Sequence, residues 1–443
     1  MNQCLLSYYG DDLTGSTDVM EALSSGGVPT VLFLGIPDAE LLARFADCRA
    51  VGLAGTSRSE TPEWMDRNLP AAFAWLKALG ADVCHYKVCS TFDSSPAIGN
   101  IGRAIEIGRR VFGQGAVPLL VGAPQLKRYT AFGNLFAGYR GETFRIDRHP
   151  VMSRHPVTPM NEADLLLHLS RQTKLGSVLI DLAALRAADV NQRVDLAAEA
   201  GGIVFLDVAD LETQRLAGEQ LWRLAGNQGP FLCGSSGIEY ALLPTWIENN
   251  LCPGTASFAP LDPVESMAVV SGSVSPTTEA QIRFACDNGF DGIALDPLRL
   301  SREGSENYVE EAVRSGLSVL SQGRSVILFT ALGPGADRGA EIDADPEARH
   351  RLGRGLGRIL GQIVVKAGLK RAVIAGGDTS SHALGQLGVD ALTVRLPLPQ
   401  SPGSPLCVAH SRSTAIEGLQ IAMKGGQIGL DDYFCALRDG NRN

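Results

Sequence analysis

The sequence predicts an α/β protein of two domains, each built on a mostly parallel sheet. Apolar runs alternate with helical patterns along the chain, as in parallel strands joined by crossover helices. The 443 residues suffice for two or three domains, and 50 glycines against 6% aromatic residues indicate many turns. A break in the alternation past the middle separates two α/β patterns.

Apolar runs predict the strands of the first domain, residues 1–242. A strand over Cys4–Tyr9 is followed by a polar turn and a helix over Ser16–Ser25. Further strands are expected at Pro29–Leu34, Ala50–Ala54, Asp82–Tyr86, Pro118–Val121, Ser177–Ile180 and Gly202–Asp207. This strand–helix–strand spacing predicts a sheet covered on both faces.

The second domain, residues 264–443, follows a stretch that predicts an interdomain linker. Residues 243–263 read LPTWIENNLCPGTASFAPLDP, rich in proline and small polar residues, with a short helix as an option. A helix is then expected at Pro276–Asn288, and a mobile surface loop at Gly333–Asp345. Strands are expected at Met267–Val270, Gly292–Leu295, Ser325–Thr330 and Arg371–Ala375, with a long helix between the last two.

Composition excludes several classes of protein. Acidic residues outnumber basic ones by 48 to 39 and no basic tract is present, which disfavours a nucleic-acid partner. The nine cysteines are scattered without a C-x-x-C pair, which indicates reduced thiols in a reducing compartment. The sequence shows neither a signal peptide at its start nor a long apolar run. We therefore expect a cytoplasmic protein that does not bind a membrane.

Open α/β sheets bind ligands beyond the carboxyl ends of their strands, so the turns there are the candidate sites. The first is Gly10-Asp11-Asp12-Leu13-Thr14-Gly15-Ser16. One carboxylate suffices to cap the following helix, which leaves Asp12 surplus. A surplus carboxylate there can accept a proton from a hydroxyl or hold a metal through water. The alternative is a plain helix cap with a tight glycine turn.

Two further turns in the first domain carry groups that suit an anionic polyol. Arg58, within Gly55–Ser59, offers a planar fork that matches a carboxylate. Lys87 ends a strand and is followed by a hydroxyl-rich turn that contains Ser90 and Asp93. The alternatives are a solvated surface arginine and an ordinary serine- and threonine-rich turn.

Three small-residue turns in the second domain indicate a nucleotide site. Each follows an expected strand or lies near the C-terminus, and free backbone N–H groups in such turns bind phosphate. Asp378 is further placed to orient Mg²⁺ or a ribose hydroxyl. The three turns are Val270–Ser275, Ala375–Ser381, which contains Gly376, Gly377 and Asp378, and Met423–Gly429.

Several familiar motifs do not occur. The chain has no G-x-x-x-x-G-K-S/T, no H-E-x-x-H and no G-x-G-x-x-G that opens a helix after the first strand. Walker-type phosphate binding, zinc peptidase chemistry and a standard dinucleotide site are therefore disfavoured. The seven histidines show no metal-ligand spacing.

These segments together resemble the four-carbon acid sugar kinase family. The resemblance spans almost the whole chain and implies an ATP-dependent kinase with an N-terminal acid-sugar domain and a C-terminal nucleotide domain. It implies that Asp11, Asp12, Arg58, Lys87, Ser90 and Asp93 line the sugar-acid site, and that Ser273, Gly376–Thr379 and Gly426 hold ATP. The matching segments are GDDLTGSTD (10–18), TSRS (56–59), YKVCSTFDSSPAIGNIG (86–102), HPVTPM (155–160), SGSVSPTTEAQI (271–282), GGDTS (376–380) and MKGGQIG (423–429).

The amino-acid sequence of one segment narrows the range of expected substrates. CSTFDS at 89–94 is similar to the branch of the family that phosphorylates 3-oxo-tetronates, whereas threonate and erythronate kinases more often read K-K-x-D-S-T-L-R-G there. QSPGSPLC at 400–407 and the long GADRGAEIDADPEARHR at 335–351 depart from the family pattern. Threonate, erythronate and a related branched or oxidised acid therefore stay open.

The expected reaction is transfer of the ATP γ-phosphoryl group, with Mg²⁺, to the terminal hydroxyl of the acid. Arg58 and Lys87 would fix the substrate, Asp12 is the preferred general base, and Asp11 is its competitor. Closure about the 243–263 linker would exclude water. The competing classes are a sugar-acid-binding regulator and a non-kinase enzyme such as an acid-sugar dehydratase or aldolase. A homodimer is expected.

Overall fold

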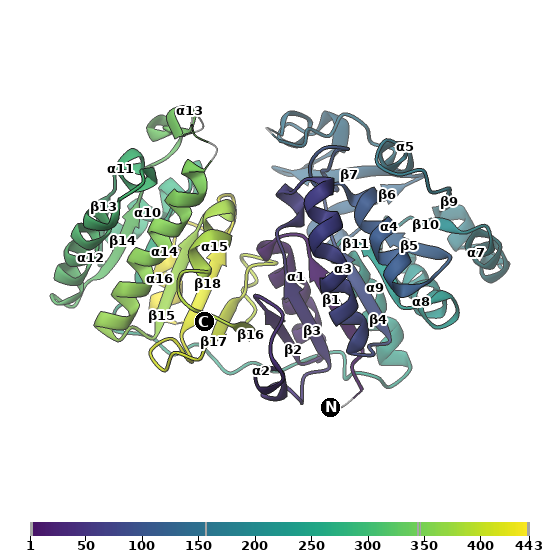
Figure 1. The fold of residues 1–443 in the computed structure, drawn as a ribbon, viewed down its shortest axis with the longest axis horizontal. Coiled ribbons are helices and arrows are strands. Elements are labelled where there is room, and N and C mark those ends of the chain that lie inside the picture. Colours follow the sequence, from purple (N-terminus) through teal and green to yellow (C-terminus); the bar gives the residue numbers. More distant parts are fainter. Residues whose placement is uncertain (1–2, 156, 343–344, 346, 441–443) are drawn as a thin grey trace. The chain divides into compact units, whose positions relative to one another are not determined.

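The chain folds as two compact units, residues 1–256 and 257–443 (Figure 1). The structure is a computed structural model that describes residues 3–155, 157–342, 345 and 347–440. The division falls inside the stretch expected as a linker, and helix α9 (Gly237–Glu248) occupies the first part of that stretch. In Figure 1 the first unit runs from purple to teal and the second from green to yellow.

The first unit is built on a parallel sheet. Its strands are mostly buried apolar runs, as expected where helices cover both faces of a sheet. The strand order is β2 (Thr30–Phe33), β3 (Ala50–Ala54), β1 (Leu6–Gly10), β4 (Val83–Lys87), β11 (Phe231–Gly234), β5 (Ala116–Leu120), β10 (Gly202–Leu206) and β9 (Ser177–Ile180). Each neighbouring pair in this order is parallel, which confirms the predicted fold class.

The helices of the first unit follow the strands as crossover connections. α3 packs on α4, whereas α1 and α8 pack on α9. Asn100 caps α4 by accepting the Arg103 N–H at 2.6 Å. The helices before α9 are α1 (Leu13–Ser25), α2 (Ala39–Ala43), α3 (Pro62–Ala78), α4 (Ile101–Phe112), α5 (Leu165–Ser170), α6 (Leu182–Leu185), α7 (Val190–Glu199) and α8 (Leu211–Gln228).

A small antiparallel sheet in the first unit was missing from the prediction. It consists of β6 (Arg128–Ala131), β7 (Asn134–Tyr139) and β8 (Glu142–Arg145). Both hairpins turn through two residues of positive φ, Phe132-Gly133 and Arg140-Gly141. Such turns usually carry Asn-Gly or Asp-Gly, so Phe-Gly and Arg-Gly gave the sequence no hairpin signal.

The second unit has a mixed sheet. The order is β13 (Phe290–Ala294), β14 (Ser325–Phe329), β12 (Ala268–Ser271), β15 (Arg371–Ala375), β18 (Gln420–Lys424), β17 (Leu406–His410) and β16 (Ala391–Leu396). Pairing is parallel from β13 to β18 and antiparallel from β18 to β16. Strand residues such as Val269, Ile327 and Val373 form a core with Ile282 and Phe434 from neighbouring helices.

Helices also account for part of the segment expected to be a surface loop. Within 333–345 the chain forms a turn of 3-10 helix at Pro334–Ala336 and helix α13 at Gly339–Ile342, so the prediction of a surface loop was wrong for these residues. Asp343 and Ala344 lie outside the described residues. The Arg338 guanidinium pairs with Glu341 three residues on, at 2.8 Å, which supports a helical turn that the small residues alone do not signal.

The remaining helices of the second unit connect its strands. They are α10 (Pro276–Asp287), α11 (Pro297–Ser301), α12 (Glu306–Leu320), α14 (Ala348–Ala367), α15 (Gly377–Leu384) and α16 (Tyr433–Asp439). Within the residues described, no helix has both the length and the apolar character needed to cross a membrane. The described residues also include all nine cysteines, and none of them forms a disulfide.

Candidate active site

Three predicted turns of the first unit lie at the carboxyl ends of adjacent strands. In the register of the sheet, Gly10 at the end of β1 pairs with Ala54 of β3 and with Lys87 of β4. Helix α3 carries the chain from β3, on one side of β1, to β4 on the other. A reversal of this kind creates a crevice at the strand ends, which is where α/β sheets bind ligands.

Asp12 caps helix α1 and forms an ion pair at the same time. Its Oδ1 accepts the Gly15 N–H at 2.5 Å, and its Oδ2 lies 2.6 Å from Nη1 of Arg58. The expectation that Asp12 is surplus to the cap was therefore wrong, because Asp11 is the carboxylate that the cap does not use. Which of the two aspartates caps the helix depends on the residue at which the strand ends. Two adjacent acidic residues in a sequence do not reveal that position.

Asp11 is almost fully buried, with 4% of its surface exposed. Its backbone N–H donates to the Lys87 carbonyl at 2.9 Å and its carbonyl accepts from the Arg58 N–H at 3.1 Å, so Asp11 links all three strand ends. In the described part of the chain its Oδ1 has no hydrogen-bond partner. Burial and the nearby Asp12 charge raise the pKa of Asp11 to about 7, against the opposing effect of Arg58 and Lys87.

Arg58 lies between two carboxylates. Its Nη2 is 3.0 Å from Oδ2 of Asp93, while its Nη1 holds Asp12. Asp93 is buried and also accepts hydrogen bonds from the hydroxyls of Thr91, at 2.5 Å, and Thr158, at 3.0 Å. Burial opposes the charged form of Asp93, but Arg58 and the Thr91 hydroxyl outweigh it and hold the pKa of Asp93 below its usual value. Asp93 is thus an ionised carboxylate that orients the guanidinium.

Lys87 completes the cluster from beneath α1. Only 2% of its surface is exposed, and its Nζ donates to the Val88 carbonyl at 2.8 Å. A Cβ placed on Gly15 would lie 2.9 Å from this Nζ and 2.7 Å from Oδ1 of Asp12, so the helix needs glycine to let the two groups approach. Burial lowers the pKa of Lys87, but the Asp18 and Asp11 carboxylates outweigh burial and raise it. Ser90 lies half-buried in the turn that follows β4.

Three residues near this cluster were not singled out from the sequence. Thr158 and Asp18 stand inside segments that carried the resemblance, HPVTPM and GDDLTGSTD, which was the available signal. Arg128 begins β6 and gave no signal. Its Nη1 donates to the Leu126 carbonyl at 3.1 Å, and among the described residues it has no carboxylate partner. Arg128 follows the carboxyl end of β5, so it lies along the same edge of the sheet as the ends of β1 and β4.

The three glycine- and serine-rich turns of the second unit also share one edge of a sheet. Ser271 of β12 pairs with Ala375 of β15, which pairs with Lys424 of β18. The turns continue this row, since Gly272 N–H donates to the Ala375 carbonyl at 3.0 Å and Gly376 N–H to the Lys424 carbonyl at 2.9 Å.

Two features of these turns suit a phosphate group. A Cβ placed on Gly426 would lie 2.8 Å from Oγ of Ser273, so these two predicted residues adjoin closely. Gly376 precedes α15 with a φ of 122°, and no side chain in the described part of the structure caps that helix. Uncapped N–H groups at a helix start bind anions, so the residues present fit a nucleotide phosphate. Gly377 begins α15, whereas the side chains of Asp378 and Thr379 lie outside the described residues.

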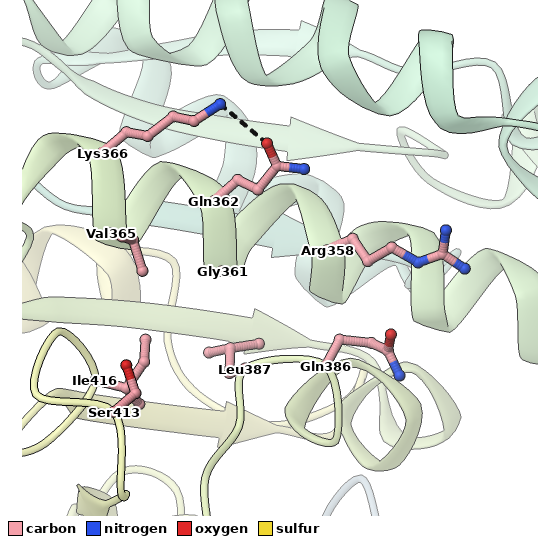
Figure 2. Close-up of a pocket in the computed structure, with 9 residues that line it drawn as sticks. All are labelled: Arg358, Gly361, Gln362, Val365, Lys366, Gln386, Leu387, Ser413 and Ile416. Carbon is pink, nitrogen blue, oxygen red and sulfur yellow. Dashed lines mark hydrogen bonds between the residues drawn. The ribbon is translucent and has the colours of Figure 1, made fainter.

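A separate hollow of about 320 Å³ lies on the second unit, between α14 and the segments around Leu387 and Ile416 (Figure 2). Arg358, Gln362 and Lys366 of α14 are among its lining residues, and Figure 2 shows the Lys366 and Gln362 side chains hydrogen-bonded to each other. These residues belong to the half of α14 that leads into the start of β15, so the hollow is remote from the Gly376 turn at the other end of that strand. No described residue of the predicted sites lines it.

Over the described residues, no cluster of three or more His, Cys, Asp or Glu side chains is arranged to hold a metal ion.

Comparison with protein families assigns one function to each half of the chain. Residues 6–242 match the family described as a sugar-binding N-terminal domain, and residues 268–434 match a nucleotide-binding C-terminal domain. These are the two units that hold the Asp11–Asp93 cluster and the glycine-rich turns, respectively.

Similar proteins cover nearly the full length. The chain is 49% identical to the 3-oxo-isoapionate kinase of Paraburkholderia graminis, over 98% of this chain and 94% of that protein. It is 29% identical to the 3-oxo-tetronate kinase of Pseudomonas savastanoi pv. phaseolicola (97% of this chain, 96% of the relative) and 30% identical to that of Methylobacterium radiotolerans (97% of each).

Two solved structures share the fold. The protein HI1011 of Haemophilus influenzae matches with a TM-score of 0.73 at 23% identity, covering 98% of this chain and 99% of that one. The putative tRNA synthase of Salmonella typhimurium LT2 matches with a TM-score of 0.77 at 24% identity, covering 98% of each chain. With the family matches and the relatives above, this chain belongs to the four-carbon acid sugar kinase family and is a carbohydrate kinase with a sugar-binding first unit and a nucleotide-binding second unit.

Proposed function

We propose that this chain transfers the γ-phosphoryl group of ATP to the terminal hydroxyl of a 3-oxo sugar acid. The observation that supports it is the Arg58 guanidinium held between Asp12 and Asp93 beside the buried Lys87, at the strand ends of the unit that matches a sugar-binding domain. Donors and acceptors fixed against one another in this way suit a polyhydroxylated ligand. The named relatives are kinases of 3-oxo-isoapionate and 3-oxo-tetronate.

Each charged residue has a role in this proposal. Lys87 and Ser90 hold hydroxyl and oxo groups of the substrate. Arg58 orients the two carboxylates that pair with its guanidinium group. Because Arg58 is already shared by two carboxylates, Arg128 is the cation that meets the substrate carboxylate. Asp12 is the proposed general base, since its side chain is 26% exposed and is fixed by two partners. Asp11, with a pKa of about 7 but deeply buried, is the competing base.

The second unit supplies the phosphoryl donor. The N–H groups at the start of α15 and the turns around Ser273 and Gly426 hold the phosphates of ATP. Bound with ATP, Mg²⁺ neutralises charge on the transferring phosphoryl group. Positioning and charge neutralisation are what this transfer requires, so the chain needs no covalent intermediate.

The preferred substrate is 3-oxo-isoapionate, with 3-oxo-tetronate as the second candidate. The first is favoured by 49% identity over nearly the full chain, and the second by relatives at 29% and 30% identity and by the CSTFDS wording at 89–94. The experiment is an ADP-release assay with 3-oxo-isoapionate, 3-oxo-tetronate, threonate and erythronate. We expect the highest kcat/KM with 3-oxo-isoapionate. A higher kcat/KM with 3-oxo-tetronate would reverse the order of the two candidates, and ADP release with threonate or erythronate alone would contradict the 3-oxo requirement.

A further inference from the structure

Among the described residues, a buried lysine in the second unit has no counter-charge. Lys424 ends strand β18 with 1% of its surface exposed. Its Nζ donates to Oγ1 of Thr278 at 3.1 Å and to the Gly425 carbonyl at 3.0 Å. Across the described ranges, no carboxylate lies within 4.0 Å of this ammonium group. A buried charge without a partner is costly, so a protein that keeps one has a use for it.

The position of Lys424 indicates what that use is. It stands in one row with Ser271 and Ala375, the residues from which the other two phosphate-type turns begin. Thr278 extends the connection, because its hydroxyl donates to the Gly426 carbonyl at 3.1 Å. The ammonium group thus lies beneath the place where the three turns meet.

Lys424 also has binding capacity left over. An ammonium group carries three donors, and the two contacts above use two of them. The ring of Tyr433 lies 5.9 Å from Nζ and offers no formal charge. Burial lowers the pKa of Lys424 to about 8, as expected for an ammonium group without a compensating anion. As far as the described side chains show, one donor and an uncompensated charge therefore remain next to the amide-rich turns.

We propose that Lys424 receives a phosphate group of the bound nucleoside di- or triphosphate and is the main protein charge that recognises it; this rests on the proposed function. The backbone amides of the turns give direction to the phosphate oxygens, and Lys424 adds a compact charge that amides lack. The bound phosphate in turn compensates the buried ammonium group.

A purely structural role for Lys424 makes opposite predictions. If the lysine only ties β18 to α10 through Thr278, replacing it with methionine lowers the melting temperature of the free protein and leaves nucleotide affinity intact. If it serves phosphate, the free Lys424→Met protein is as stable as the wild type or more stable, because a buried unpaired charge has been removed. Its affinity for phosphorylated nucleotides then falls.

The test measures the binding of ATP, ADP and adenosine to the full chain by calorimetry. We expect Lys424→Met to weaken ATP and ADP binding by at least about tenfold, with adenosine binding unchanged, since hydrogen bonds to charged groups contribute on that scale. Lys424→Gln keeps a donor for Thr278 without the charge, and we expect the same loss. Lys366→Met, an exposed lysine on α14 that contacts Gln362, is the matched control and should bind like the wild type.

The outcomes separate this inference from the proposed function. ATP affinity within twofold of the wild type in folded Lys424→Met and Lys424→Gln overturns the role of Lys424 and leaves the kinase proposal standing. An equal loss of adenosine and ATP binding overturns it as well. A wild-type protein that binds no ATP contradicts the kinase proposal itself. Should neither variant fold, a wild-type crystal structure with ADP decides: Nζ within hydrogen-bond distance of a phosphate oxygen supports the inference, and a phosphate bound elsewhere overturns it.

Discussion

Arg58 Nη1 lies 2.6 Å from Oδ2 of Asp12, although the two residues are 46 positions apart in the chain. The contact joins the end of β3 to the end of β1, and the other arm of the guanidinium extends the connection to Asp93, after β4. Because Asp12 also caps α1, the helix start, the guanidinium and both carboxylates form one fixed unit. A change in any member is therefore expected to alter the geometry of the others.

The first prediction concerns the proposed base. Asp12→Asn still caps α1, because asparagine is as good a cap as aspartate, but it cannot accept a proton. We expect kcat to fall by about 10²- to 10⁴-fold, the usual range for a general base, with little change in the melting temperature. Steady-state kinetics with a saturating acid and ATP give the answer.

Two further variants make that result specific. Asp181→Asn replaces another aspartate cap, which accepts the Ala183 and Ala184 N–H groups at the start of α6, and should leave kcat unchanged. Asp11→Asn should cost less activity than Asp12→Asn. If Asp11→Asn costs more, the base is Asp11 and the assignment to Asp12 is wrong.

The second prediction concerns the fork of Arg58. Arg58→Lys keeps the charge but cannot bind Asp12 and Asp93 through two separate nitrogen atoms. We expect kcat/KM to fall by at least about tenfold, because the two carboxylates lose their fixed orientation.

The first unit offers a matched control for Arg58. Arg186 lies near two carboxylates on the surface, with Nη2 2.9 Å from Asp210 and 3.2 Å from Glu212. Arg186→Lys should leave activity unchanged and alter the free energy of unfolding by no more than about 0.5 kcal/mol. Equal kcat/KM values for Arg58→Lys and the wild type would show that the fork has no role in the reaction.

The third prediction concerns Gly15, where the backbone of α1 lies close to the side chains of Asp12 and Lys87. A methyl group there would lie 2.7 Å from Oδ1 of Asp12 and 2.9 Å from Nζ of Lys87, which is closer than atoms pack. Gly15→Ala should therefore lower kcat/KM by at least about tenfold, with an overpacking cost of about 1–3 kcal/mol that exceeds the gain in helix propensity. Gly226→Ala in α8, with no neighbouring atom within 4 Å of the new methyl group, should instead stabilise the protein by about 0.5–1 kcal/mol.

The fourth prediction follows from the raised pKa of Asp11. Its pKa is about 7 in the folded protein against an ordinary value of 3.8. Between these pH values the folded state holds a proton that the unfolded chain has released, so this group makes the free energy of unfolding fall as the pH rises from about 4 to about 7. Asparagine does not titrate. The melting temperature of Asp11→Asn, measured relative to that of the wild type, should therefore be higher at pH 8 than at pH 5. An equal difference at both pH values would contradict a raised pKa of the buried Asp11 carboxyl group.

The sequence predicted the parallel strands well because their buried apolar runs are bounded by polar turns. Ala50–Ala54, Ser177–Ile180 and Arg371–Ala375 have the predicted bounds. The β6–β8 sheet escaped because its turns lack the usual asparagine or aspartate. The antiparallel strands β16–β18, whose pairing includes a register shift between Val394 and Leu396, were not predicted.

The candidate site was predictable in position but not in its contacts. Strand ends located Asp11, Asp12, Arg58, Lys87 and Asp93, because parallel strands bring their carboxyl ends together. Which aspartate caps α1 depends on backbone geometry within one turn. That Lys424 is buried, with no counter-charge among the residues the structure describes, depends on packing, which a lysine at a strand end does not reveal.

The transfer of phosphate from ATP to the sugar acid is tested most directly by ³¹P NMR of the reaction. With 3-oxo-isoapionate or 3-oxo-tetronate, we predict one new phosphomonoester for each ADP formed, and neither product with Asp12→Asn on the same time scale. ADP that appears with inorganic phosphate alone, or a reaction that proceeds without ATP, would contradict the account.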